Sequence, residues 1–329
     1  MRYESRLDDD TRADSFLSQV LARTPKLQRM KIRRVGFTGL ILFLLLSLVR
    51  PGAAQEAVPK ASSRHSLWRI EGTNNTVYLL GSIHLLKESN YPLPAPIESA
   101  FSNAQVAVFE ADVSKMEQPE AQLQLMTKAR LPEGQTLKDQ LSAEAYAEFQ
   151  EHAKRLEIPD VVFAQFKPSL AAIMLAMLEL QKLGFDPNQG VDKHFFDLAR
   201  KAGKQTMALE TVDFQIDLVT DFTKEEGEQL MKTTLKDIEN TRKMYGEIVQ
   251  AWQTGDAGGL EKLVNEALSE APVIAKRMLT DRNRNWLPKI KKLLRDDKIA
   301  IVIVGAGHLV GREGVVELLK KEGLKVTQL

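Results

Sequence analysis

The chain has 329 residues with ordinary apolar and charged fractions, enough for one large domain or two small ones. Its 45 basic and 44 acidic residues leave a formal net charge of +1, which gives no support for nucleic-acid binding. Cysteine is absent, which excludes disulfides, a thiolate nucleophile and sulfur ligands for zinc. Any metal bound by this chain must therefore be held by His, Asp and Glu side chains.

The N-terminal part of the chain has the layout of an export signal. Residues 1–29 are polar and lack apolar periodicity, which is typical of a disordered tail or of sequence upstream of the true start. A basic stretch then begins at Met30 and an apolar run covers residues 35–49, which together predict a secretory signal peptide over residues 30–54. The run is shorter than the roughly 20 residues that span a bilayer. We therefore expect translation from Met30, a linker over residues 55–65, a periplasmic or secreted product, and no stable membrane span after cleavage.

Two apolar runs far apart in the sequence each end in a G-x-x-H motif. The first, residues 76–84, ends at His84, and the second, residues 299–308, ends at His308. Aliphatic runs bounded by glycine are typical of buried strands in an α/β sheet, and ligands bind beyond the carboxyl ends of such strands. We predict that the two strands are parallel neighbours and that both histidines enter one site. The alternative is that each histidine is a turn or packing residue.

Two further predicted strands end in a carboxylate. Residues 105–112 contain an apolar run that reaches Glu110, and residues 204–210 end at Glu210. A charge at the end of a buried strand is costly unless it is paired or binds a metal. Glu110 is therefore a candidate ligand, and the alternative is a simple ion pair with a neighbouring Arg or Lys.

The remaining patterns predict helices around these strands. Residues 170–180 are almost entirely apolar, which predicts a buried core helix with methionines used for packing, and Asp192 is predicted as the N-cap of a helix that reaches Ala202. His194 lies two residues further on and is interpreted as structural. Other expected elements are a hairpin around residues 72–75, short helices at 94–103 and 313–321, a helical stretch at 118–183 with Ser142 as an N-cap, amphipathic helices at 212–296 interrupted at 255–259 and 281–285, and a last strand at 325–329. Strand–helix alternation at both ends, with helices between, predicts an α/β fold with a helical cap.

Taken together, these motifs resemble the TraB/GumN family, which also includes the animal Tiki proteins. The resemblance covers residues 66–329 and is carried by the two G-x-x-H motifs, the Val-Phe-Glu110 and Leu-Glu210-Thr strand ends, and the Arg282-Asn283 pair. It implies a mixed sheet with flanking helices and a helical insertion, similar to the EreA, ChaN and Tiki proteins. It also implies a metal-dependent, peptidase-like activity, with manganese or cobalt associated with the Tiki branch. Some bacterial members are linked to shutting down peptide pheromone signalling.

The resemblance and the donor types together give a predicted site. The predicted metal ligands are His84, Glu110 and His308, because imidazole and carboxylate suit Mn, Co or Zn. Glu210 is predicted as a further ligand or as the general base. Arg282, helped by Asn283, is expected to polarise a substrate carbonyl or to hold a ligand carboxylate, and the alternative places both on a helix surface or cap.

The sequence therefore predicts a secreted or periplasmic metal-dependent hydrolase that acts on a peptide or protein substrate. The H-E-x-x-H and G-x-S-x-G signatures of common zinc proteases and serine hydrolases are missing. One alternative is a non-catalytic protein that uses the same crevice to sequester a peptide or haem. Another is a structural module in which the histidines only turn the chain.

Overall fold

The computed structural model describes residues 64–269 and 271–329. The expected tail, the signal peptide and nearly all of the linker fall in residues 1–63 and so lie outside the described residues. Over the described ranges, no helix combines the length and the apolar character that a membrane crossing requires.

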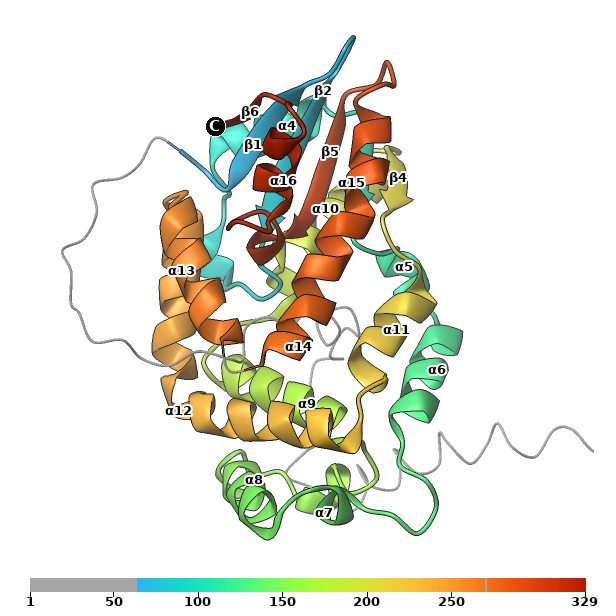
Figure 1. Ribbon diagram of the computed structural model, residues 1–329, viewed down its shortest axis with the longest axis vertical. Helices are drawn as coiled ribbons and strands as arrows, with labels where there is room; N and C mark the ends of the chain where they lie inside the picture. Colours follow the sequence, from blue (N-terminus) through green and yellow to red (C-terminus); the bar gives the residue numbers. More distant parts are fainter. Residues whose placement is uncertain (1–63, 270) are drawn as a thin grey trace, which may run out of the picture. The chain divides into compact units, whose positions relative to one another are not determined.

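A six-stranded mixed sheet forms the centre of the fold, in the order β4-β3-β5-β2-β1-β6 (Figure 1). Four neighbouring strands, β4, β3, β5 and β2, are parallel, while β1 is antiparallel to both β2 and β6. The strand bounds are β1 Leu67–Glu71, β2 Thr76–Ser82, β3 Val106–Phe109, β4 Gln205–Ala208, β5 Ala300–Gly305 and β6 Val326–Gln328. The predicted α/β class with a mixed sheet is confirmed.

The two motif strands, β2 and β5, lie side by side in the middle of this sheet. They are parallel, and their last residues, Ser82 and Gly305, are paired in the register. Every residue of β5 is buried, as its run of Ile and Val predicts. Because parallel neighbours end at the same edge of a sheet, the segments that carry His84 and His308 leave the sheet together.

Helices cover both faces of the sheet. In Figure 1, α15 (Asp281–Leu293) and α16 (Val315–Lys321) lie in front of the strands and α10 (Val191–Lys201) lies behind them. The ring of Phe196 on α10 packs edge-on against Phe109 of β3, with ring centres 5.2 Å apart. On the same side, α4 (Ala95–Asn103) packs against α10 through aromatic rings. These helices fix the ends of the strands from which the polar residues project.

The predicted helical insertion consists of two groups of helices. The first group, between β3 and β4, is α5 Val113–Met116, α6 Pro119–Ala129, α7 Leu137–Gln140, α8 Ala143–Arg155 and α9 Pro168–Lys182, followed by α10. The second group, between β4 and β5, is α11 Val212–Thr220, α12 Lys224–Gln253, α13 Ala257–Leu268 and α14 Pro272–Ala275, followed by α15. Helix α9 is the expected core helix, in which Met177 is fully buried, and the side chain of Ser142 caps α8. The predicted helical cap is therefore confirmed.

Two local predictions are wrong. The N-cap of α10 is Gly190 and not Asp192. At Gly190 the chain passes so close to the segment after β2 that a Cβ would lie 2.4 Å from the carbonyl oxygen of His84, so only glycine fits there. Residues 281–285 do not interrupt the helices. A π-helical turn, Lys276–Thr280, continues directly into α15, and two of the polar side chains that suggested a break, Arg282 and Asn283, are buried and hydrogen-bonded.

Candidate active site

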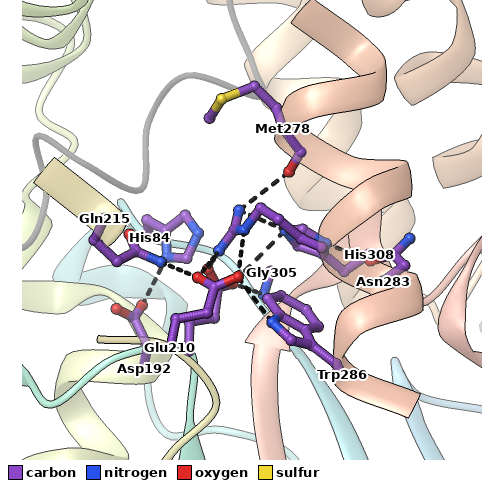
Figure 2. A network of polar contacts seen from close by, with 11 residues as sticks. His84, Asp192, Glu210, Gln215, Met278, Asn283, Trp286, Gly305 and His308 are labelled. Atoms are coloured by element: carbon purple, nitrogen blue, oxygen red, sulfur yellow. Dashed lines mark hydrogen bonds and ion pairs between the residues drawn. The ribbon is translucent and has the colours of Figure 1, made fainter. Parts of the chain in front are cut away.

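His84 follows β2 and its imidazole is oriented by a carboxylate. Its Nδ1 lies 3.1 Å from Oδ1 of Asp192 on α10, and both side chains are buried (Figure 2). Because a carboxylate accepts, Nδ1 donates its hydrogen and Nε2 keeps a lone pair. Burial by itself lowers the pKa of His84, but the carboxylates of Asp192 and Glu110 together outweigh burial and raise the pKa above the ordinary value. Among the described residues, Nε2 of His84 has no hydrogen-bond partner.

His308 follows β5 in a short 3₁₀ turn, Ala306–His308, and is held in the same tautomer by an amide. Its Nδ1 lies 2.6 Å from Oδ1 of Asn283, whose amide nitrogen donates to the carbonyl of Glu313 at 2.9 Å. That second bond fixes the amide orientation, so Nδ1 of His308 is the donor and Nε2 carries the lone pair. Burial and then the neighbouring Arg282 hold the pKa of His308 well below its usual value, so the ring is neutral. The indole of Trp286 packs on it, with ring centres 4.4 Å apart.

Arg282, at the start of α15, is the buried cation of the site, and all five of its N–H groups are used. Its Nε and one terminal nitrogen each donate to Glu210 at 2.9 Å, and that terminal nitrogen also donates to Glu110 at 2.5 Å. The other terminal nitrogen donates at 3.1 Å both to the carbonyl of Met278 and to Nε2 of His308. No N–H remains for a substrate carbonyl in this conformation. Of the two roles predicted for Arg282, the geometry favours holding carboxylates.

Glu110, directly after β3, is kept as an anion. Its Oε1 accepts the backbone N–H of Gly305 at 2.7 Å and its Oε2 accepts from Arg282. Burial raises the pKa of this carboxyl, but Arg282, the two histidines and the Gly305 N–H together outweigh burial and hold the pKa at about 2. The ion pair that was the alternative for Glu110 is therefore present, and its Oε1 still faces the two histidines.

Glu210, just after β4, accepts four hydrogen bonds. Two come from Arg282, one comes from the indole N–H of Trp286 at 2.8 Å, and one comes from the amide of Gln215 at 2.5 Å. A carboxylate with its lone pairs so occupied can accept a proton only after it releases a donor. The arrangement favours Glu210 as the anchor of Arg282 over its predicted roles as ligand or general base.

Gly305 marks the point at which the predicted ligands converge. A Cβ built on Gly305 would lie 3.3 Å from Nε2 of His84, 3.4 Å from Oε1 of Glu110 and 3.4 Å from Cδ2 of His308. Both G-x-x-H histidines and Glu110 thus surround one small space that only glycine leaves open. The predicted convergence of His84 and His308 is confirmed.

The converging residues fit a divalent metal ion in their donor chemistry. They offer two imidazole Nε2 atoms and one carboxylate, and each imidazole is oriented through Nδ1 as metal-bound histidines are. The spacing is looser than in a formed site, since Nε2 of His308 lies 4.0 Å from Oε1 of Glu110. Within residues 64–269 and 271–329, no group of three His, Asp or Glu side chains has metal-binding spacing. Arg282 must also release Nε2 of His308 before that atom can coordinate an ion, so the metal stays a prediction.

Three contributors were missed in the sequence. Asp192 looked like a helix cap, and Gln215 and Trp286 carried no motif signal. A signal did exist for Trp286, which is four residues after Arg282 and therefore shares its helix face. Conversely, the alternative that placed Arg282 and Asn283 on a helix surface is wrong, because they are only 3% and 2% exposed.

Comparison with known proteins agrees with the motifs. The sequence model of the TraB/PrgY/gumN family matches residues 66–328. The chain belongs to this family. It is similar to the uncharacterized protein YbaP of Escherichia coli K12 and to that of Shigella flexneri, each 24% identical over 247 residues, or 75% of this chain and 89% of the relative. An uncharacterized protein of Treponema pallidum is 19% identical over 323 residues, covering 91% of this chain and 97% of the relative. No solved structure gives a significant match.

Proposed function

We propose that this TraB/PrgY/gumN family member is a metal-dependent hydrolase that cleaves peptide bonds, with His84, Glu110 and His308 holding the ion. The observation that carries the proposal is the convergence of these three side chains at Gly305. Two imidazole nitrogens and a carboxylate around one point form a donor set for Mn²⁺, Co²⁺ or Zn²⁺. When bound, such an ion supplies Lewis acidity and a water that ionises near neutral pH.

The other residues of the site prepare this donor set. Asp192 and Asn283 each accept from an Nδ1–H, which turns both Nε2 lone pairs toward the shared point. Glu110 remains charged because Arg282 offsets the cost of burying its carboxylate. Arg282 is in turn anchored by Glu210. The role of this network is to hold the ligands in position, and no step of proton transfer is assigned to it.

The three predicted ligands are buried. The side chains of His84, Glu110 and His308 are at most 5% exposed, so a peptide reaches them only after neighbouring residues move. Exclusion of water strengthens the electrostatic interactions inside such a site. Arg282 has no N–H left for a substrate carbonyl, and this supports a second candidate function, in which the protein binds a peptide or haem without cleaving it.

The deciding experiment is turnover of a peptide library by residues 55–329 with added Mn²⁺ or Co²⁺, followed by mass spectrometry. The hydrolase proposal predicts cleavage that a chelator abolishes and that the added ion restores. The matched control is the Glu110→Gln variant, in which the side chain keeps its shape but loses its charge. We expect no cleavage by this variant. If library peptides are retained by the wild type without any cleavage, the binding function replaces the hydrolase.

We also propose that the protein acts in the periplasm or outside the cell. The support is the predicted signal peptide at residues 30–54. Mass spectrometry of the protein recovered from the periplasm or medium tests this location. We expect a mature N-terminus near Gln55, and an N-terminus upstream of Met30 contradicts the assignment.

A further inference from the structure

Two buried polar atoms near the carboxyl end of β2 have no hydrogen-bond partner in the described part of the chain. The hydroxyl of Ser82 and Nε2 of His84 make no hydrogen bond to any described residue, although the residues are only 1% and 4% exposed. A buried hydroxyl without a partner costs about 1–3 kcal/mol. An alanine at position 82 would avoid that cost, so the hydroxyl is best explained by something that binds to it.

Both atoms belong to residues that line the same small cavity. It has a volume of about 10 Å³, close to the minimum for one water molecule, and its lining also includes the carboxylate of Glu110 and the amide of Gln215. Asp192 also lines the cavity, and the rest of the wall is apolar, with Phe109 among its side chains. A cavity of this size and lining fits one small polar species and no larger group.

The position of Ser82 is fixed by the sheet. It is the last residue of β2 and pairs with Gly305, the residue around which His84, Glu110 and His308 converge. The strand pairing on both sides of β2 holds its backbone, so ordering the hydroxyl for a ligand loses little entropy. Ser82 therefore lies beside Gly305 in the sheet and lines the same cavity as His84 and Glu110.

We propose that Ser82 supplies a fourth donor, its hydroxyl oxygen, to the ion held by His84, Glu110 and His308. This inference rests on the proposed function. A neutral oxygen donor added to two imidazoles and a carboxylate gives a set with two nitrogens and two oxygens. Oxygen ligands suit Mn²⁺, so the added hydroxyl makes the set better suited to Mn²⁺ than the two imidazoles and one carboxylate are without it.

The test uses the absence of cysteine from the natural chain. In Ser82→Cys the introduced thiol is the only one in the protein, and a thiol that coordinates a metal is deprotonated. We expect this variant, loaded with Co²⁺, to show a thiolate-to-cobalt charge-transfer band at one ion per chain. The matched control is Ser66→Cys. Ser66 is equally buried, but its hydroxyl donates to the carbonyl of Trp252 at 3.1 Å, so we expect no band.

A second variant makes the test independent of cysteine. We expect Ser82→Ala to bind Mn²⁺ on the order of tenfold or more weakly than the wild type by calorimetry, while the melting temperature of the metal-free protein does not fall. Suppose that the wild type binds Mn²⁺ or Co²⁺. If Ser82→Ala then binds Mn²⁺ as tightly as the wild type does, or if Ser82→Cys binds Co²⁺ without a charge-transfer band, Ser82 is not a ligand. The ion site formed by His84, Glu110 and His308 then stands without it. If the wild type binds neither ion, the proposed metal-dependent function falls and the Ser82 assignment falls with it.

Discussion

The Nδ1 atom of His84 lies 3.1 Å from Oδ1 of Asp192, a buried contact between residues 108 positions apart. This contact sets the tautomer of the imidazole and so decides which nitrogen faces Gly305. Partners of this kind contribute strongly to metal sites although they do not touch the ion.

We therefore expect Asp192→Asn to weaken Mn²⁺ binding by about 10- to 100-fold. The amide oxygen can still accept from Nδ1, but the negative charge that supports the imidazole is lost. Calorimetric titration measures the effect. The control is Asp197→Asn on the same helix, where the side chain is 41% exposed and pairs with Lys193, and its affinity should equal that of the wild type.

Arg282→Lys is expected to reduce the free energy of unfolding by about 3–5 kcal/mol. A lysine cannot supply five planar donors, so Glu110, Glu210 and His308 would lose buried partners. Urea unfolding of the metal-free protein measures this change. In Arg284→Lys, two residues along α15, the side chain is 58% exposed and pairs with Glu313, so we expect a change within about 0.5 kcal/mol. Equal stabilities of the two variants would show that the Arg282 network does not hold the fold.

Glu210→Gln distinguishes an anchor from a general base. As the anchor of Arg282, Glu210 loses two charge-assisted hydrogen bonds on substitution, and we expect a loss of about 2–3 kcal/mol of stability together with reduced activity. A pure general base predicts reduced turnover with unchanged stability. Thermal unfolding and turnover measured on the same samples separate the two roles, and Glu313→Gln on the exposed Arg284 pair serves as the control.

Gly305→Ala is expected to block the shared space. The new methyl group would lie 3.3–3.4 Å from atoms of His84, Glu110 and His308, so these side chains must move apart by a few tenths of an ångström. We expect Mn²⁺ binding to drop by at least about tenfold, a loss comparable to that of an orienting partner. Gly246→Ala is the control. A Cβ there meets nothing within 4 Å in α12, so the substitution should leave Mn²⁺ affinity unchanged and raise stability slightly through helix propensity.

The sequence predicted the parts of the fold that depend on local pattern. The runs that became β2 and β5 are apolar and bounded by glycine, so both their strand character and their parallel pairing followed from general rules for α/β sheets. The predicted hairpin and helical insertion are present for the same reason. Asp192 is the instructive failure, because helix-start rules describe an acidic residue near the start of a helix and carry no information about a histidine 108 residues away.

The residues of the site also divide into those that local sequence pattern identifies and those that only tertiary packing brings into place. His84, His308 and Glu110 were identifiable because each directly follows a strand, where geometry alone brings side chains together. Asp192, Gln215 and Trp286 were not, since each lies on a helix that reaches the strand ends only through tertiary packing. Ser82 could not be recognised as a candidate either, because only its lack of a hydrogen-bond partner among the described residues distinguishes it from any other serine at the end of a strand.

The central claim is that the two G-x-x-H histidines form one ion-binding site, and metal content tests it most directly. Wild type, His84→Ala, His308→Ala and His194→Ala are stripped with chelator, reloaded with Mn²⁺, freed of excess ion and analysed by elemental mass spectrometry. We expect one ion per chain in the wild type and in His194→Ala, whose half-buried ring instead packs on Tyr91, and none in the other two variants. Full metal content in both His84→Ala and His308→Ala would show that the paired motifs only turn the chain at the ends of β2 and β5.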